Sequence, residues 1–397
     1  MLNLFSDEIR RNPYTLYDQL RSTSPILYSP QGDLCMVFDY EGVKRVVNDH
    51  EAFSSKAAPS GEKPLEWLIF LDPPRHTKLR ALISQAFTPR SVANLEPRIR
   101  EISRNLLDQT IEHGEMDLVA DFSVPLPLMV IAEMLGIPSA DWPRFRHWSD
   151  VLLNLSQTVY GGEEGEMAVK EFRTASAQMN DYLVGLLDAR QTASKDDLLT
   201  RLVKAEVDGE RLTSEEIMGF FKLLILAGHE TTTNLLNNAI LCFIENQDQL
   251  TRLQTTPDLL PLAIEEVLRY RAPVQVIFRA ARYDVEMHGE MIPAGKLVLG
   301  MVGSANRDPK QFQYADRFDI TRNPNPHIAF GHGIHFCLGA ALSRLEARIA
   351  LSDLLERAKG LELASNEPWE PRKAFHVHGP THLPIRFEPG RQIAAQA

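Results

Sequence analysis

The feature that most constrains the fold is a helical run of unusual length in the second half of the chain. Thr213-Ser214-Glu215-Glu216 has the pattern of a capping box, with Thr at the N-cap and Glu three residues later. Helical periodicity then continues to about Asn246. A run of over thirty residues at 1.5 Å per residue gives a helix of roughly 50 Å. Such a helix would cross a whole domain.

Most of the remaining chain also has apolar residues at helical spacing, and strand patterns are sparse. Further helices are expected at Thr88 to His113, Asp141 to Gln157 and Glu166 to Arg190. Strands are expected at Asp33 to Phe38 after the turn Pro30-Gln31-Gly32, in a hairpin from Arg279 to Met301 that turns at Pro293-Ala294-Gly295, and at Pro384 to Phe387. The sequence therefore predicts a mainly α-helical protein with small β-sheets, folded as one domain over residues 1–397.

Composition and charge exclude several classes of protein. The net charge of −11 argues against generic nucleic-acid binding, which needs a basic surface. Three cysteines far apart in sequence build no disulfide framework, which fits a reducing compartment. The N-terminus lacks the pattern of a signal peptide, and the strongest apolar stretches, residues 125–137 and 217–228, are too short to span a bilayer. We expect a cytoplasmic protein without a membrane segment.

The segment from Phe330 to Gly339 is the most informative part of the chain. Its glycines predict a tight loop, and the amphipathic pattern that follows predicts a helix. Cys337 then lies at a helix N-terminus, where the dipole and free N–H groups favour a thiolate. Three interpretations follow from the spacing: a buried structural cysteine, a zinc site with His327, His332 and His335, or an axial ligand of haem iron. Covalent haem is not expected, because Cys-x-x-Cys-His is absent.

Three further segments have residue types that suggest chemistry. Residues 227–234, Ala-Gly-His-Glu-Thr-Thr-Thr-Asn, interrupt the apolar part of the long helix. They indicate either a local opening that holds water or O2, or a patch that faces solvent. Glu266 and Arg269 are spaced for an ion pair on a helix face. After Pro73-Pro74, His76 and Arg80 are i,i+4 neighbours, which suits a carboxylate, although each side chain alone fits an exposed position.

These motifs together resemble one family. Residues 330–339 match Phe-x-x-Gly-x-His-x-Cys-x-Gly, which resembles the haem-binding loop of bacterial members of the cytochrome P-450 family. Residues 227–231 resemble its Ala-Gly-x-Glu/Asp-Thr oxygen-activation motif, with His229 at a variable position, and residues 266–269 resemble its Glu-x-x-Arg motif. The resemblance extends from Asn12-Pro13-Tyr14 to Leu383-Pro384-Ile385-Arg386-Phe387. It implies the cytochrome P-450 fold, a single triangular domain with a long central helix over the haem. Because the chain ends shortly after the last strand, no fused reductase is expected.

The resemblance also implies the cofactor and the residues of the site. The cofactor is haem b, iron protoporphyrin IX with an axial thiolate from Cys337. The expected contacts to the haem propionates are His76, Arg80, Arg279 and His335. Glu230 and Thr231 match the acid and the alcohol that help deliver protons to bound oxygen. Glu266 and Arg269, joined by Arg317 from a later segment, are expected to have a structural role.

The implied activity is a monooxygenase that hydroxylates (or epoxidises) an apolar small molecule with O2 and two electrons. Electrons are expected from a ferredoxin or flavodoxin with its reductase, and the protein is expected to be a monomer. Candidate docking residues are Arg75, Lys78 and Arg344. The segments that resemble pocket walls are Lys56 to Phe70, Leu223 to Thr231, Pro273 to Phe278 and Phe375 to His378. Their apolar side chains suit a fatty acid, terpenoid, steroid or macrolide. His376 and His378 fit either a polar group of the substrate or a solvated turn.

Two other functions are compatible with the sequence. A peroxygenase of the same fold would use hydrogen peroxide directly, but intact Glu230 and Thr231 argue against it. A non-catalytic protein would be a haem-binding carrier or sensor, or a zinc-loop module.

Overall fold

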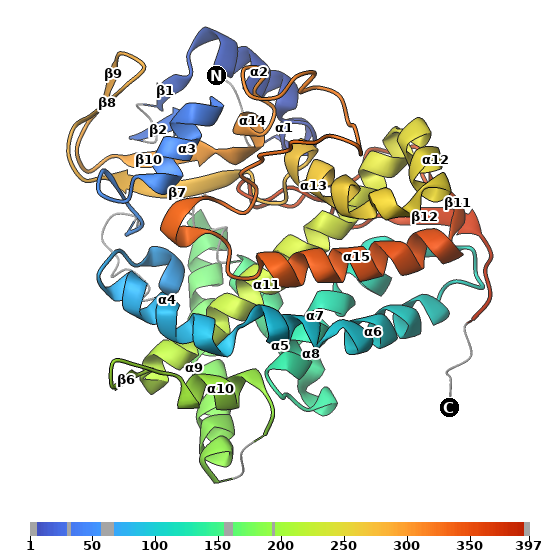
Figure 1. The fold of residues 1–397 in the computed structure, drawn as a ribbon, viewed down its shortest axis with the longest axis horizontal. Coiled ribbons are helices and arrows are strands. Elements are labelled where there is room, and N and C mark those ends of the chain that lie inside the picture. The colour runs from blue at the N-terminus through green and yellow to red at the C-terminus, as the bar shows by residue number, and fades with distance from the viewer. Residues whose placement is uncertain (1–5, 30–32, 57–66, 155–161, 193–194, 393–397) are drawn as a thin grey trace. The chain divides into compact units, whose positions relative to one another are not determined.

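The computed structural model describes residues 6–29, 33–56, 67–154, 162–192 and 195–392 (Figure 1). The chain forms two compact units. The first unit comprises Met1–Pro64, Ser103–Ser123 and Thr231–Ala397, and the second comprises Leu65–Ile102 and Val124–Glu230. Helices α6 (Glu96–Asp108) and α11 (Ser214–Glu245) contribute residues to both units. The single domain over residues 1–397 stays a prediction.

The first unit is organised around a five-stranded sheet with the order β1-β2-β10-β7-β3. Strands β2 and β10 are parallel, and the other neighbours are antiparallel. Its strands are β1 (Ile26–Ser29), β2 (Leu34–Val37), β3 (Phe53–Ser54), β7 (Val276–Ala281) and β10 (Leu297–Met301). A second sheet joins β11 (Lys359–Leu363), β12 (Pro384–Glu388) and β4 (Glu115–Asp117), and β8 (Val285–Met287) pairs with β9 (Glu290–Ile292). The helices are α1 (Asp7–Arg11), α2 (Tyr14–Thr23), α3 (Tyr40–Asn48), α12 (Gln247–Thr255), α13 (Leu260–Tyr270), α14 (Val302–Ala305) and α15 (Ala340–Arg357).

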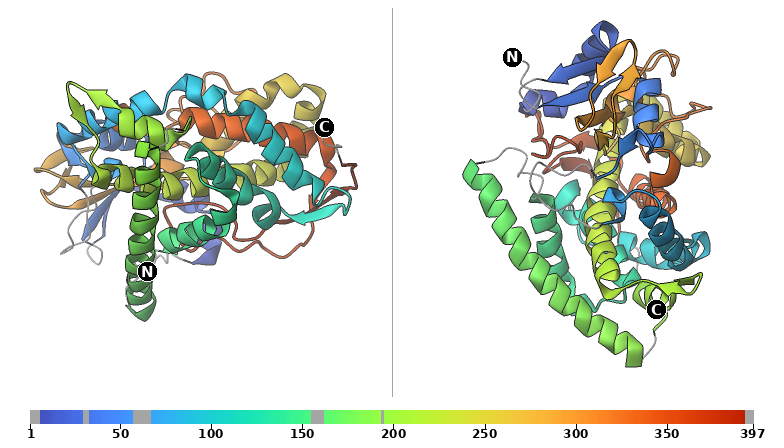
Figure 2. Two further views of the ribbon diagram at one scale, coloured as in Figure 1. Left: turned by 90° about the horizontal axis from the view of Figure 1, so that it is seen from below. Right: turned by 90° about the vertical axis from the view of Figure 1, so that its left-hand side faces the viewer.

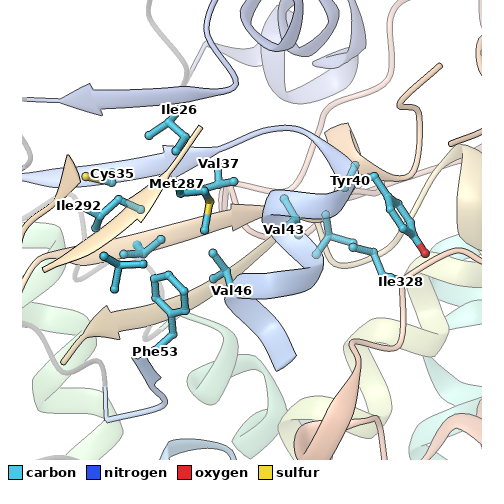
Figure 3. Packing of buried hydrophobic residues seen from close by; sticks show 14 of the residues in the cluster. Ile26, Cys35, Val37, Tyr40, Val43, Val46, Phe53, Met287, Ile292 and Ile328 are labelled. Carbon is cyan, nitrogen blue, oxygen red and sulfur yellow. The ribbon is translucent and has the colours of Figure 1, made fainter. Parts of the chain in front are cut away.

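The core of this unit lies between α3 and the five-stranded sheet (Figure 3). Asp39 caps α3 by accepting the N–H of Gly42, and the helix then turns Val43 and Val46 toward the sheet. Phe53 of β3 and Val37 of β2 belong to the same buried cluster. This core fixes β7, which bears Arg279 of the candidate site, and β3, which is followed by Ser55, a contact of His335.

The second unit is helical apart from one short hairpin. Its elements are α4 (Arg75–Ala86), α5 (Pro89–Ala93), α7 (Pro125–Met134), α8 (Trp142–Asn154), α9 (Gly162–Thr192), α10 (Leu198–Lys204), β5 (Glu206–Val207) and β6 (Glu210–Arg211). Helix α9 is a long helix of 31 residues that belongs wholly to this unit (Figure 2). Rings from α8, α9 and α11 pack together: Phe145 lies 5.3 Å from Trp148, 5.9 Å from Tyr182 and 5.6 Å from Phe221. This aromatic cluster fixes α8 and α9 against the first half of α11.

The long helix predicted from the sequence is confirmed as α11, Ser214–Glu245. Its capping box is also confirmed, because Glu216 N–H donates to Thr213 Oγ1 (3.2 Å) and Thr213 N–H donates to Glu216 Oε2 (2.9 Å). Helices α8 and α9 and the strands β2 and β12 occupy their predicted segments. Gln157 and the turn Pro30-Gln31-Gly32 lie outside the described residues.

The prediction of one helix from Thr88 to His113 is wrong, because the segment forms α5 and α6 with a break at residues 94–95. Pro97 has no N–H to continue the hydrogen bonds of α5, whereas proline is tolerated in the first turn of a new helix. The segment from Arg279 to Met301, predicted as one hairpin, contains two pairs of strands. Strands β7 and β10 pair with each other, and the β8–β9 hairpin is inserted between them.

Candidate active site

Cys337 lies on a loop that leads directly into α15. Its N–H donates to Phe330 O (2.9 Å), which closes the loop, and its carbonyl accepts the N–H of Ala340 (3.4 Å). Gly331 and Gly333 have φ of +71° and +68°, which suit glycine. The helix is capped by Gly339, so Cys337 lies two residues before the N-cap rather than at it. The cysteine itself is partly exposed.

The surroundings of the Cys337 sulfur fit a flat group. A Cβ added to Gly339 would meet only one atom within 4 Å, the Sγ of Cys337 at 4.0 Å. A Cβ on Gly331 would meet only the carbonyl of His335, at 3.7 Å. A side chain at either glycine would fill this space. A single thiolate beside an open glycine surface is the donor arrangement expected for the axial ligand of a haem.

A charged cluster fixes the start of this loop. Arg344 of α15 donates to both carboxylate oxygens of Glu265 on α13, at 2.6 and 2.8 Å. His327 Nε2 is hydrogen-bonded to the same carboxylate at 3.0 Å, and the Arg344 guanidinium lies 4.5 Å from the centre of the Phe330 ring. We call these residues, Glu265, His327, Phe330 and Arg344, the loop clamp. The bonds to Glu265 raise the pKa of Arg344, and the Cys337 sulfur is close enough to contribute in the same direction.

The histidines near Cys337 do not form a zinc site with it. His327 bonds to Glu265, His332 Nδ1 lies 3.1 Å from Asn48 Oδ1, and His335 Nε2 lies 2.9 Å from Ser55 Oγ. Within the described ranges no group of three or more His, Cys, Asp or Glu residues is arranged to hold a metal ion. The geometry therefore gives no support to the zinc interpretation.

The structural role predicted for Glu266 and Arg269 agrees with their contacts, but the third residue was misassigned. Both side chains are fully buried and hydrogen-bonded to each other at 2.8 Å. The arginine that joins them is Arg322, whose Nε lies 3.1 Å from Glu266 Oε2. Arg317 contributes only its carbonyl to Arg269 (2.9 Å), and its side chain stacks on Tyr314. The sequence placed Arg317 because Ala-Asp-Arg-Phe resembled the family segment, and nothing distinguished the arginine five residues later.

Two of the predicted propionate contacts belong to the first unit. Arg279 is buried in β7, and its Nη1 donates to Phe278 O (2.8 Å). Ser54 of β3 pairs with Ala280, the residue after Arg279, and the neighbouring Ser55 bonds to His335. Strand β3 thus brings Arg279 and His335 to the same region.

The other two predicted propionate contacts, His76 and Arg80, lie on α4 of the second unit. They are one turn apart, as predicted, with His76 buried and Arg80 partly exposed. Because the two pairs belong to different units, their convergence on one cofactor stays a prediction.

The polar patch of α11 is buried, so the solvent-facing interpretation is wrong. His229 and Glu230 are 1% and 3% exposed, and Thr231 is half-buried. The predicted local opening is also not observed, since the helix stays α-helical throughout. A contact that the sequence did not indicate holds the patch: His229 Nδ1 lies 2.8 Å from Ser149 Oγ of α8. The residue before the candidate acid is therefore tied to α8.

A second polar cluster, also missed from the sequence, joins α11 to α15. Thr232 Oγ1 donates to Ser343 Oγ (3.3 Å) and interacts with the carboxyl group of Glu346. Burial raises the pKa of Glu346 to about 8, although the hydrogen bond with Thr232 opposes this shift. Burial thus favours the neutral, protonated form of the Glu346 carboxyl group. Its spacing in an amphipathic helix gave no sign of this, because burial depends on the packing of α15.

Aromatic rings from two of the predicted pocket segments pack together in the first unit. Phe278 lies 6.0 Å from Phe375 and 6.0 Å from His376, with both ring pairs near perpendicular. Burial lowers the pKa of His376 to about 4, so its imidazole is neutral at pH 7. His378 has a different environment: it is buried, bonds to Arg11 O (3.1 Å) and lies 5.9 Å from the Tyr14 ring. It is a structural residue.

The remaining pocket segments differ in exposure. Trp67 and Leu68 are buried, Ile69 is exposed, and Phe70 stacks on Trp67 with the ring centres 6.2 Å apart. Residues 57–66 of the first predicted wall lie outside the described residues.

The three candidate docking cations are already paired with acids. Arg75 bonds to Glu216, Lys78 to Glu210 (2.7 Å), and Arg344 belongs to the loop clamp. Their charge is largely neutralised within their own units.

Comparison with known proteins identifies the family. The cytochrome P-450 sequence model matches residues 165–373. Cytochrome P-450 109 of Bacillus spizizenii is 42% identical over 388 residues, covering 98% of this chain and 95% of the relative. The crystal structure of CYP109E1 from Bacillus megaterium in complex with testosterone has a TM-score of 0.87 and 38% identity, covering 95% of this chain and 99% of that one. P-450BioI in complex with acyl carrier protein carrying hexadec-9Z-enoic acid has a TM-score of 0.89 and 36% identity, covering 96% and 99%.

The chain therefore belongs to the cytochrome P-450 family, a class of haem-thiolate oxidoreductases. Its cofactor is haem b, and it is a monooxygenase of an apolar small molecule that takes electrons from a redox partner. The predicted mainly helical fold is confirmed. In the part of the chain that the structure describes, none of the helices has the length and apolar character needed to cross a membrane.

Proposed function

We propose that Cys337 is the axial ligand of the haem iron and that Glu230 and Thr231 handle the protons of the reaction. The observation that carries the ligand assignment is the Cys337 loop, which holds one sulfur beside an open glycine surface. When bound, the haem activates O2 and inserts one oxygen atom into a C–H or C=C bond. The protein supplies position, exclusion of water and protons.

Thr231 and Glu230 have separate tasks in this proposal. The Thr231 hydroxyl, on the half-buried face of α11, accepts one hydrogen bond and donates another, so it can orient a water and pass a proton. The Glu230 carboxyl is buried next to it in sequence and supplies or replaces that proton. His229 and Ser149 hold the backbone of this turn, so the carboxyl keeps its position.

His76, Arg80, Arg279 and His335 are proposed to bind the two haem propionates. Cationic and hydrogen-bonding groups suit carboxylates. Support within the first unit comes from β3, which holds Arg279 and His335 in one region.

We further propose a rigid, ring-containing substrate, a steroid or terpenoid, in preference to a fatty acid or macrolide. The aromatic wall of Phe278 and Phe375 offers flat faces and edges on which fused rings pack well. His376 is the polar group of this wall, and its neutral imidazole would bond to a ketone or hydroxyl at no cost in charge burial. The relative that binds testosterone agrees with this preference, whereas the relative that binds an acyl carrier protein represents the competing substrate class.

The test of the substrate class is a binding screen. Testosterone, corticosterone, hexadec-9Z-enoic acid and its acyl carrier protein adduct are titrated while the Soret band is followed for the blue shift that accompanies loss of iron-bound water. Steroids should bind more tightly, and His376→Leu should weaken binding of ketones about tenfold, as expected for one hydrogen bond. His376→Asn, which keeps a neutral donor and acceptor, is the matched control. Tight binding of the fatty acid with no response to any steroid would reverse the assignment.

The partner is proposed to be a ferredoxin or flavodoxin with its reductase, acting on a monomeric protein in the cytoplasm. Because Arg75, Lys78 and Arg344 are paired with acids, docking is expected to rely on local shape more than on these charges. Reconstitution of the purified protein with a ferredoxin or a flavodoxin and its reductase tests the partner. The size of the purified protein in solution tests the monomer, and its presence in the cytoplasmic fraction of an extract tests the location.

A further inference from the structure

Fully buried amide side chains occupy the second half of α11, within the first unit. Asn234, Asn237 and Asn238 have no exposed surface, and they alternate with buried leucines such as Leu235 and Leu236. Buried polar groups nearly always have hydrogen-bond partners, supplied by the protein or by ordered water. The hydrogen-bond partners of these amides therefore indicate whether protein groups or water molecules lie beside this part of α11.

The amides form a stripe between Thr231 and the end of the helix. Its members are Thr231, Asn234, Asn237, Asn238 and Glu245. Every member lies three, four or seven residues along the chain from at least one other member. Residues at these spacings share one side of an α-helix. We call these five residues the amide stripe. It begins at the half-buried Thr231 and ends at Glu245, whose carboxylate is 44% exposed.

The stripe packs against two segments that are distant in sequence. Asn238 Nδ2 donates to the carbonyl oxygens of Arg271 and His378, both at 3.0 Å. A Cβ added to Gly379 would come within 2.2 Å of Asn234 Oδ1, so only a glycine leaves room for this amide. At the outer end, the Arg271 guanidinium donates to the Glu245 carboxylate at 3.0 Å.

Several polar atoms beside the stripe have no hydrogen-bond partner from the described protein. They are both amide atoms of Asn237, Asn238 Oδ1, Gln275 Oε1 and His378 Nδ1. Gln275 belongs to the same region, because its N–H donates to His376 O (2.8 Å), next to the turn that faces Asn238. Donors and acceptors gathered in this way are the partners that buried water requires.

We propose that a string of ordered water molecules lies along the amide stripe and carries protons from solvent at Glu245 to the hydroxyl of Thr231. This proposal rests on the proton-handling role of Thr231 proposed above. Each water receives one proton from the outer side and releases one to its inner neighbour, and no electrons move. The amides do not ionise, so they hold the waters without trapping the proton.

Ionisable neighbours do not block this path. The Glu245 carboxylate balances the charge of Arg271 at the outer end. Burial raises the pKa of Cys242, which lies next to the stripe, to about 12, so it stays a neutral thiol.

The test uses the folded holoenzyme and compares Asn237→Leu, which removes two unpaired polar atoms at similar volume, with Asn237→Ser, which keeps a polar group. Long-lived internal waters are counted by oxygen-17 magnetic relaxation dispersion, and product per reductant is measured with released hydrogen peroxide. Asn237→Leu should hold fewer waters and lose about tenfold in product per reductant, since proton transfer by positioned groups contributes at least that much. Asn237→Ser should keep both. Leu236→Met, a buried apolar change on the same helix, is the control.

An unchanged water count in Asn237→Leu overturns the proposal, and so does a reduced count with coupling equal to that of Leu236→Met. If Asn237→Leu does not fold, Gln275→Met removes an unpaired atom on the neighbouring segment and provides the same comparison. If the proposed role of Thr231 itself were wrong, Thr231→Ala would leave product per reductant unchanged, which distinguishes that outcome. If Thr231→Ala lowers product per reductant but the amide variants do not, only the water string is rejected.

Discussion

Arg344 holds its guanidinium 4.5 Å from the ring of Phe330, the residue whose carbonyl accepts the Cys337 N–H. The same guanidinium makes a two-bond contact with Glu265, so α13, α15 and the cysteine loop are joined through one side chain. A planar guanidinium can stack and pair at once, whereas a lysine cannot. The loop clamp therefore holds the start of the cysteine loop in place.

The first prediction concerns Glu265→Gln. Burial alone would raise the pKa of Glu265, but hydrogen bonds from Arg344 and His327 lower it to about 2. A lowered folded-state pKa stabilises the protein above the ordinary value of 4.5, and this stability is lost as the pH falls toward 2. Glu265→Gln should cost about 1–3 kcal/mol at pH 7 and flatten the acid side of the stability curve. Urea unfolding between pH 2 and 7 measures both effects, with the exposed Glu356→Gln as control. Equal acid sensitivity in both variants would contradict the role of the clamp.

Glu346 should produce the opposite pH dependence. Its folded-state pKa is raised to about 8 by burial, so its stabilising contribution is complete below 4.5 and declines as the pH rises toward 8. Glu346→Gln keeps the shape and the bond to Thr232 but does not ionise. The variant should gain stability relative to the native protein by at most about 1.4 kcal/mol per pH unit across this range. The measurement is the denaturation midpoint at each pH, and parallel curves for the two proteins would reject a protonated Glu346.

The sequence predicts some of these features and not others. Local patterns were sufficient for α11, because its capping box and periodicity are contained in the helix itself. The Cys337 loop was identified because its residues are contiguous. Arg322 and Glu346 were missed because their environments are created by segments that meet only in the folded chain. Pro97 broke a predicted helix, since periodicity alone does not record a missing N–H.

Cys337→Ser tests the axial ligand. The reduced carbonyl form of the native protein should show the long-wavelength Soret band that is typical of thiolate-bound haem. A serine hydroxyl is a far weaker donor, so this band should be lost while the fold, measured by far-ultraviolet circular dichroism, is kept. Cys242→Ser is the control, because that thiol is buried in α11 and does not belong to the Cys337 loop. An unchanged carbonyl spectrum in Cys337→Ser would exclude the assignment.

The four proposed propionate contacts should each contribute to cofactor retention. A hydrogen bond to a charged group is worth about 1.5–3 kcal/mol, so single changes to Ala at His76, Arg80, Arg279 or His335 should accelerate haem loss without abolishing binding. Transfer of haem to apomyoglobin measures the rate. Arg173→Ala, an exposed cation on α9, should have no effect. Any of the four variants that matches this control is removed from the set.

Thr231→Ala separates a monooxygenase from a peroxygenase. In the proposed mechanism the hydroxyl of Thr231 orients water and passes protons, so that reductant consumption leads to product. Removing this hydroxyl should leave electron uptake intact, because Cys337 and the haem are unchanged, but should divert electrons to hydrogen peroxide. Positioned proton donors contribute about 10²–10⁴-fold, and ordered water replaces them in part, so product per reductant should fall while released peroxide rises.

Thr233→Ala is the matched control, since its hydroxyl is already bound to Ser123 O at 2.9 Å on another face of α11. When hydrogen peroxide is supplied as the oxidant, no proton delivery to O2 is required, and Thr231→Ala should lose much less activity than in the reductant-driven reaction. Glu230→Gln should mainly slow turnover. Unchanged coupling in Thr231→Ala would remove its proposed role. Rapid native turnover with hydrogen peroxide, and none with a ferredoxin or a flavodoxin, would favour the peroxygenase, because the acid and alcohol of α11 would then serve a step that the reaction does not use.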